Sequence, residues 1–434
     1  ILFPYTHLDI PISNFCLTAL IAPYGNNSDI VRTLYQTKLS KQSVIYTPCG
    51  NYHNSFYAKM PIAFNLYRPL VSTVANKLIN IGGSNLYVAI LASSDNQEDS
   101  IVARERLSQS MKLSCVLTNP ISYELENGQA LGTPDSSVEG KKAKDYSHLI
   151  KGIPKSGTII ERGMPILGII KTDPSTKRKT DESIIYKKDK PIIVDHVSQE
   201  NNSKATVVIK IKTYVVRNVE AGDKFASRAG NKGIVSRVNS DEECIILENG
   251  IIPELQVSSF AFPSRMTVNQ FQEGRNSDLC ALLGVFMDGT MFANPENPEI
   301  ARMAKEKGLE YHGVKKAYHG VTGEQTLAGV FCVPMMYQRL TKMVADSSNV
   351  VDNPSIDIKT DQPNKGVGTG GGIRFGEMEK DTALANGSSG FIQYKMIDKC
   401  DGKDICICNT CGHIAIFNFE NNMLIGIIAN ITKE

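Results

Sequence analysis

The stretch GDKFASRAGNKG, residues 222–233, combines positive charge with three glycines. Lys224 and Lys232 lie eight residues apart, with Arg228 midway between them. Glycine lets a backbone approach a ligand closely, and lysine and arginine bind phosphate oxygens. The stretch is not a P-loop, because Asn231 separates the glycine from the lysine that should follow it directly at a helix start. Two interpretations stay open here, a phosphate-binding loop and a basic surface turn between two strands.

Composition limits where a polyanion could bind. The 434 residues carry 47 Lys and Arg against 45 Asp and Glu, a net charge of +2, so a site for phosphates must be a local patch. The ten cysteines are scattered except for four between 400 and 411, which favours a reducing compartment such as the cytoplasm. No apolar run is long enough to predict a membrane span. The chain starts at Ile1 without Met, so it is interpreted as a processed product or an incomplete start.

The spacing of apolar and polar residues along the chain predicts a mixed α and β protein. The apolar run at 84–92 and the alternating residues from 205 onward predict strands. Polar, lysine-rich stretches between short apolar runs predict an antiparallel, loop-rich insertion over 120–204. Helical spacing is found at 267–286 and at 335–346, where Leu340, Met343 and Val344 share one face. The six glycines within 364–376 exclude a regular element there.

Further charged residues are candidates for a site. Glu98 and Asp99 are adjacent, so on a strand they would point to opposite faces and form no dyad unless the backbone turns. One of them could approach a metal while the other orients a basic residue, or the pair could be a polar strand end. Arg32 and Arg265 could fork onto phosphate oxygens or be solvated partners of carboxylates. His319 suits a capping turn or a phosphate contact.

A cysteine knuckle lies near the C-terminus. Cys408 and Cys411 form one C-x2-C pair, which is half of a zinc ribbon. No second pair follows, so Cys400, Cys406 and His413 are the other candidate ligands for Zn²⁺. The alternatives are buried thiols and a half-site that another chain completes.

The order of these motifs identifies a family. From NQEDS through GDKFASRAGNKG, PSRMT, YHGVTGE, YQRLTKMV and GGGIRFGEMEKD to CNTCGHIAIF, the chain resembles the second-largest subunit of multisubunit DNA-directed RNA polymerases, called beta in bacteria. The resemblance covers nearly the whole chain and is thin over about 118–204. It extends only to the C-terminal portion of such a subunit, which implies a fragment or a split subunit of a large phage or DNA virus.

The resemblance implies an architecture. It is a mixed α+β fold with a double-psi β-barrel, a hybrid-binding region, a wall-like or flap-like β insertion and a C-terminal anchor and clamp segment. The implied boundaries are 1–117 for the first part of the hybrid-binding region with barrel strands, 118–210 for the insertion, 211–372 for barrel completion with the second part of the hybrid-binding region, and 373–434 for the anchor and clamp with the cysteine knuckle.

The resemblance also implies roles for individual residues. Lys224 and Lys232 match lysines that contact RNA phosphates near the 3′ end and the incoming nucleotide, while Arg265 and Arg32 match arginines that hold the triphosphate. Glu98 and Asp99 match an acidic pair beside the exchangeable second magnesium ion. Nucleic-acid contacts are expected of Gln42, Arg228, Asn231, His319 and Arg374.

The implied activity is shared with other chains. The three-aspartate motif that holds Mg²⁺ belongs to the largest subunit of this family, and no such run is present here, so this chain is expected to be inert alone. The implied partners are the largest subunit, the N-terminal half of a split subunit, the DNA template, the RNA transcript, nucleoside triphosphates and an initiation factor. For a viral protein the expected location is the host cytoplasm or the virion. The alternative function is a non-catalytic nucleic-acid clamp or assembly subunit of the same fold.

One stretch of the sequence departs from the family pattern. The residues ADSSNV follow YQRLTKMV, where the family usually has a basic patch.

Overall fold

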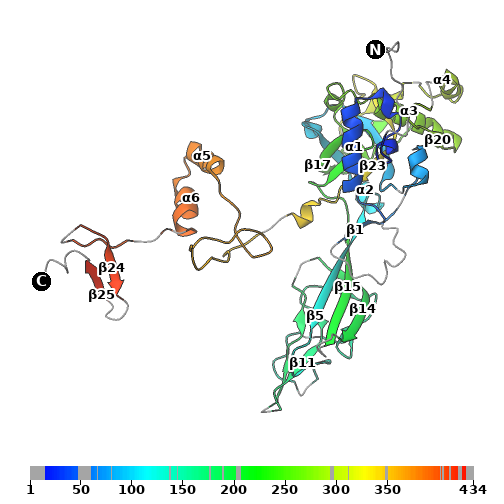
Figure 1. Cartoon of the computed structure of the whole chain (residues 1–434). Helices are drawn as coiled ribbons and strands as arrows, with labels where there is room; N and C mark the ends of the chain where they lie inside the picture. The colour runs from blue at the N-terminus through cyan, green and yellow to red at the C-terminus, as the bar shows by residue number, and fades with distance from the viewer. Residues whose placement is uncertain are drawn as a thin grey trace, which may run out of the picture. The chain divides into compact units, whose positions relative to one another are not determined.

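The computed structural model describes residues 15–46, 60–65, 67–79, 81–135, 138–143, 145–174, 177–187, 190–201, 207–293, 298–310, 312–347, 350–400, 402, 405–409, 412–418 and 423–426. The chain divides into two compact units, Ile1–Asp346 and Ser347–Glu434. Figure 1 labels the main elements of each unit.

A closed six-stranded barrel lies at the centre of the first unit. Its strands are β3 (Ser84–Ile90), β4 (Ser100–Arg104), β16 (Lys224–Ser227), β17 (Lys232–Asn239), β19 (Leu255–Val257) and β23 (Val330–Arg339). Around the ring the order is β16, β17, β4, β19, β3 and β23, and a pairing of β23 with β16 closes it. The pairs β17–β4 and β19–β3 are parallel and the other four are antiparallel. The double-psi barrel implied by the resemblance is confirmed.

Side-chain alternation fills the barrel. Because successive side chains of a strand point to opposite faces, every second residue can enter the interior. Phe225 and Val235 do so from β16 and β17, and Val88, Leu255 and Val333 join the same buried cluster. The remaining positions of these strands face outward, toward the elements that cover the barrel or toward solvent.

A second sheet is formed by strands inserted between β4 and β16, together with β1 (Met60–Ala63), which precedes the barrel strands in the chain. It contains, in order, β1, β5 (Cys115–Glu124), β15 (Val207–Arg217), β14 (Ile192–Asn201) and β9 (Ile159–Ile160), and all its pairs are antiparallel (Figure 1). Its core includes Ile160, Val194, Ile209 and Ile211. Smaller antiparallel groups complete this region: β6 (Gln129–Leu131), β11 (Ile169–Thr172) and β12 (Lys179–Asp181); β10 (Pro165–Leu167) and β13 (Ile184–Ile185); β7 (Leu149–Ile150) and β8 (Ile153–Pro154).

The main helices of the first unit are α1 (Ile30–Gln42) and α3 (Val268–Leu283). Asp29 caps α1 by accepting a hydrogen bond from the Val31 amide, and α3 ends at Gly284 in the left-handed conformation that glycine tolerates. The remaining helices are α2 (Glu105–Gln109), α4 (Pro298–Glu306), α5 (Glu377–Ala385) and α6 (Ser389–Gln393), and the remaining strands are β2 (Val71–Ser72), β18 (Ile246–Leu247), β20 (Met287–Asp288), β21 (Val314–Lys315), β22 (Ala317–Tyr318), β24 (Ala415–Asn418) and β25 (Met423–Gly426). Over the described ranges, none of the helices combines the length and apolar character needed to cross a membrane.

The second unit lacks a hydrophobic core among its described residues, where only Gly371 is buried. Its helices α5 and α6 expose apolar side chains, including Met378 and Leu384, which are 81% and 57% exposed. Apolar surface exposed to this extent is typical of a segment that packs against another molecule.

The sequence-based elements agree with the structure except at one place. The strands predicted at 84–92 and from 205 are β3 and β15, the helix predicted at 267–286 is α3, and no regular element interrupts 364–376. The antiparallel strands predicted between 120 and 204 are also found. The helix predicted at 335–346 is wrong. Strand β23 occupies this stretch up to Arg339, because pairing with β3 and β16 closes the barrel, and only a short 3-10 turn, Val344–Asp346, follows.

The burial of the cysteine side chains predicts which thiols react with an alkylating reagent. Burial raises the pKa of Cys115, Cys244 and Cys280 to about 11 and that of Cys332 to about 12. A hydrogen bond with Thr18 lowers the pKa of the exposed Cys16. Because the thiolate is the nucleophile, iodoacetamide at mildly alkaline pH should modify Cys16 and spare the four buried thiols until denaturant is added. Peptide mass spectrometry checks this, and modification of Cys332 as fast as Cys16 in the native chain would contradict the packing.

Candidate functional site

The hairpin of β16 and β17 carries the two lysines on one face. In its register Lys224 pairs with Ile234 and Ala226 pairs with Lys232, so the two lysines are diagonal neighbours on the outer face of the barrel. Diagonal neighbours in an antiparallel pair lie roughly 7–8 Å apart. Lys232 is exposed and Lys224 is half-buried, and among the described residues neither ammonium group has an ion-pair partner. Two uncompensated charges at this spacing suit a polyphosphate or two neighbouring phosphates.

Helix α1 lies against this face of the hairpin. Leu39 of α1 packs on Ala226 and Leu340. The turn between the strands approaches the same helix at Gly230, whose φ is +80°, and a Cβ atom there would overlap the carbonyl oxygen of Arg32. Only glycine allows this approach, because other residues would be strained and would collide. The hairpin turn therefore lies directly beside Arg32.

The acidic pair lies on the other side of the hairpin. A Cβ atom on Gly233 would overlap the carbonyl oxygen of Asp99, so β17 begins in contact with the turn that holds Glu98 and Asp99. Both acidic residues have positive φ, 51° and 66°, a conformation that is uncommon for residues other than glycine and that clusters at functional sites. The backbone does turn here, which the sequence alone left open.

Asp99 orients a basic residue while Glu98 stays exposed. The Asp99 carboxylate forms an ion pair with Arg265, which is mostly buried, with 19% of its side chain exposed. Glu98 is exposed and, in the described part of the chain, has no ion-pair partner. The described residues contain no group of three or more His, Cys, Asp or Glu side chains placed to hold a metal ion. Glu98 is thus the carboxylate of the pair that forms no ion pair within the described residues, and its contact with a metal ion stays a prediction.

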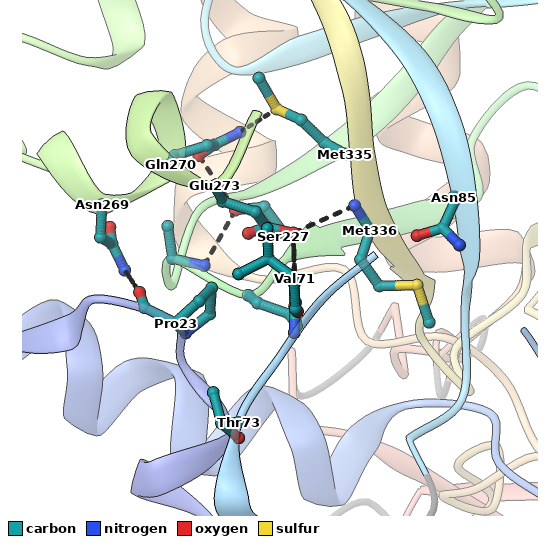
Figure 2. Close-up of polar contacts among 12 residues, drawn as sticks. Pro23, Val71, Thr73, Asn85, Ser227, Asn269, Gln270, Glu273, Met335 and Met336 are labelled. Atoms are coloured by element: carbon teal, nitrogen blue, oxygen red, sulfur yellow. Dashed lines mark hydrogen bonds and ion pairs between the residues drawn. The ribbon is translucent and has the colours of Figure 1, made fainter. Parts of the chain in front are cut away.

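Arg228 is buried in an ion pair, unlike the two lysines of the hairpin. Its side chain has no exposed surface, and its Nη2 donates to Glu273 Oε1 at 2.7 Å and to the carbonyl oxygen of Val71 at 2.8 Å. The same Oε1 accepts the Met336 amide at 3.2 Å (Figure 2). Because the guanidinium is buried against a carboxylate, this structure gives no support to the nucleic-acid contact of Arg228, which stays a prediction.

A second buried ion pair lies just before the hairpin. Arg339 Nη2 donates to Asp223 at 2.6 Å, and both side chains are at most 3% exposed. The guanidinium also donates to the carbonyl oxygens of Leu113, Arg217 and Asn218. Asp223 precedes Lys224 directly, so the hairpin is held by a buried ion pair at each end of β16.

The structure also places Gln42 and Asn231 at the hairpin. The Gln42 carbonyl accepts the Thr341 amide, and the neighbouring Leu340 amide donates to the Lys224 carbonyl, both at 2.9 Å. The exposed Gln42 side chain thus lies near Lys224. Asn231 is 8% exposed, and its amide nitrogen donates to Thr267 at 3.0 Å and to Gln270 at 2.8 Å. Its nucleic-acid contact stays a prediction.

His319 is not brought to the hairpin. His319 follows β22, where its Nδ1 accepts the Thr322 amide, as the capping interpretation expected. The adjacent Gly320 packs on the backbone of Glu242 and Cys244, beyond the end of β17 opposite to Lys232. Because a strand rises about 3.3 Å per residue, Lys232 at the start of β17 lies roughly 23 Å from Asn239 at its end. Arg374 is exposed and belongs to the second unit, so both contacts stay predictions.

The cysteine knuckle is described only in part. The Cys408 carbonyl accepts the Gly412 amide at 2.8 Å and the Cys406 carbonyl accepts the Ala415 amide at 2.9 Å. Cys400 and Cys406 are exposed, and Cys411 lies outside the described residues. The zinc site stays a prediction.

Sequence reasoning missed Gln270, Glu273, Asp223 and Arg339. The first two lie one helical turn apart on α3 within a buried stripe of polar residues, Asn269, Gln270, Glu273, Asn276 and Ser277. Polar residues at helical spacing usually face solvent, so the pattern alone does not distinguish this stripe from a surface. Nothing in the sequence around Asp223 and Arg339 indicates that they meet.

Two models of one protein family match this chain in succession. Residues 18–368 match the family model of RNA polymerase Rpb2, domain 6, and residues 371–433 match that of domain 7. The chain belongs to the RNA polymerase Rpb2 family. This is the family of second-largest subunits that the motif order indicated.

Named relatives come from plants, archaea and viruses. The chain is 30% identical to DNA-directed RNA polymerase II subunit 2 of Arabidopsis thaliana over 96% of its own length and 37% of the relative's length. It is 28% identical to subunit Rpo2 of Sulfolobus acidocaldarius, covering 96% and 39% of the two chains, and 28% identical to subunit 2 of Acanthamoeba polyphaga mimivirus, covering 95% and 36%. The chain therefore spans less than two fifths of the length of these relatives, and it matches their C-terminal portion.

The close approach at Gly230 predicts a measurable loss of stability. Gly230→Ala should destabilise the first unit by more than the roughly 1–3 kcal/mol of backbone strain, because the added methyl group also collides with Arg32. Gly157→Ala is the matched control, since Gly157 has a similar φ, +83°, and open space around it. Thermal unfolding of the full chain compares them, and equal losses for the two variants would contradict the wedged turn.

Proposed function

We propose that this chain forms part of the active centre of a DNA-directed RNA polymerase, where it binds the RNA 3′ end, the RNA–DNA hybrid and the incoming nucleoside triphosphate during template-directed RNA synthesis. The observation that carries the proposal is the group of four cations around one hairpin: Lys224, Lys232, Arg32 and Arg265. They come from three separate segments of the chain: helix α1, the hairpin and the segment before α3. Only Arg265 among them is paired with a carboxylate in the described structure, so most of the positive charge is free for phosphates.

The chemistry of phosphoryl transfer explains why four cations around one hairpin would assist RNA synthesis. The transfer depends on positioning and on neutralising charge around the phosphates more than on covalent help from the protein. Lys224 and Lys232 are proposed to bind phosphates of the RNA end and the incoming nucleotide, and Arg32 and Arg265 to hold the triphosphate. The Asp99–Arg265 ion pair supports this assignment, because it fixes the direction of the guanidinium before any ligand arrives.

Magnesium would supply the activation of the RNA hydroxyl and the stabilisation of the leaving group. The described residues of this chain do not form a metal site, so we propose that the largest subunit holds the ions and that Glu98 faces the exchangeable one. The chain alone would then be inactive. A zinc ion held by Cys408 and Cys411, with Cys406 and Cys400, is proposed for the knuckle.

The partners proposed are the largest subunit, a chain carrying the N-terminal regions of such a subunit, an initiation factor, the DNA template and the RNA transcript. The exposed apolar side chains of the second unit, such as Met378 and Leu384, support a large protein partner, because isolated units rarely leave them in water. The mimivirus relative supports a viral setting, in which the host-cell cytoplasm and the virion are the proposed locations.

Replacing Lys232 tests the proposal directly. In the polymerase assembled with its partner subunits, Lys232→Ala should raise the KM for the incoming nucleotide by about 10–100-fold, the loss expected for a charged hydrogen bond. Lys305→Ala, which removes an exposed lysine of α4, is the control and should leave the KM unchanged. Single-nucleotide addition on a preformed RNA–DNA scaffold measures both. Unchanged addition by Lys232→Ala at limiting substrate would favour the non-catalytic clamp.

A further inference from the structure

Gln270, in the first turn of α3, contacts both ends of the hairpin turn. It is 1% exposed, and its Oε1 accepts hydrogen bonds from Ser227 Oγ at 3.1 Å and from Asn231 Nδ2 at 2.8 Å. Ser227 is the last residue of β16, and Asn231 directly precedes Lys232 and β17. One buried oxygen atom therefore spans the turn that sets the relation between the two lysines.

The other end of the Gln270 side chain is anchored to the barrel. Its Nε2 contacts Met335 Sδ at 3.7 Å (Figure 2) and donates to Tyr337 Oη at 3.1 Å, and both partners lie on β23. Burial raises the pKa of Tyr337, so its phenol stays protonated and neutral. The amide plane of Gln270 is thus fixed by partners at both ends, and it cannot rotate without breaking hydrogen bonds in the interior.

The same contacts connect the hairpin to the segment that carries Arg265. Asn231 Nδ2 also donates to Thr267 Oγ1 at 3.0 Å, and Thr267 precedes α3 directly. Arg265 lies two residues before Thr267, and Gln270 lies three residues after it. A change at Gln270 would therefore shift the start of β17 relative to Arg265.

We propose that Gln270 is a positioning residue that holds Lys232 in register with Arg265, so that both cations meet the same triphosphate. This inference rests on the proposed function. Gln270 itself touches no ligand. It also gives Asn231 a role, because the amide of Asn231 is turned inward to the network and not outward to nucleic acid.

The first arm of the test compares two buried amides of the same helix. Gln270→Leu in the assembled polymerase removes the hydrogen bonds with little change in volume, and it should raise the KM for the incoming nucleotide about tenfold with little change in kcat. Asn276→Leu is the matched control, because Asn276 is also buried on α3 but donates to Tyr24 at 2.7 Å. The control should lower the melting temperature to a similar degree and leave KM unchanged. An equal rise in KM for both variants overturns the inference.

The second arm asks whether Gln270 acts through Lys232. In the Lys232→Ala background, Gln270→Leu should change KM by less than about twofold, because the contact it positions is already gone. The same tenfold rise in both backgrounds would overturn the positioning role while leaving the proposed function intact. If Lys232→Ala alone has no effect, the proposed function fails, and this inference fails with it.

A milder variant keeps the test usable if Gln270→Leu does not assemble. Tyr337→Phe removes only the phenolic acceptor and retains the bonds between Gln270 and the hairpin. It should raise KM in the same direction by a smaller factor, and that rise should also vanish in the Lys232→Ala background. An unchanged KM for Tyr337→Phe would count against the anchoring of the hairpin through Gln270.

Discussion

The ion pair between Arg228 and Glu273 is the interaction on which the arrangement of the site depends. Both side chains are at most 2% exposed, so neither charge is compensated by water. Breaking such a pair by removing one partner costs about 3–5 kcal/mol, because the remaining charge is buried alone. Its additional hydrogen bonds reach Val71 and Met336, which are far apart in the sequence. The pair thus joins the hairpin, α3, β2 and the barrel strand β23 at one point.

The hairpin is held from several sides, and each contact has a different physical origin. Phe225 and Val235 bury apolar surface inside the barrel, and Asp223 with Arg339 fixes the start of β16. Gly230 and Gly233 allow close approach to the backbones of α1 and of the acidic turn. These contacts leave Lys232 exposed and Lys224 half-buried, so positive charge remains accessible on the hairpin. A rigid support with free charges on its surface is what a phosphate-binding site requires.

The sequence indicates the family and the charged residues much better than it indicates their support. Motif order predicted the barrel, and the local patterns predicted β3, β15 and α3, since these follow ordinary hydrophobic periodicity. The hydrophobic pattern wrongly predicted a helix at β23. This strand is almost fully buried, and the buried Leu340 and Met343 that follow it have the spacing of one face of a helix. Nor does the sequence indicate that Arg228 is buried, because a basic residue in a basic loop carries no sign of the glutamate 45 residues later that pairs with it. The polar stripe of α3 has the spacing of a solvent-facing surface, and only the tertiary structure shows that it faces inward.

Amide hydrogen exchange in a Glu273→Gln chain tests the central claim most directly. The substitution keeps the shape of the side chain and leaves the Arg228 charge unpaired in the interior. The account predicts that exchange of the amides in residues 224–233 accelerates at least about tenfold, while the amides of β14 and β15 in the inserted sheet keep their protection. Unchanged exchange in the hairpin, or an equal acceleration in both regions, would contradict the claim that this buried ion pair holds the lysine hairpin in place.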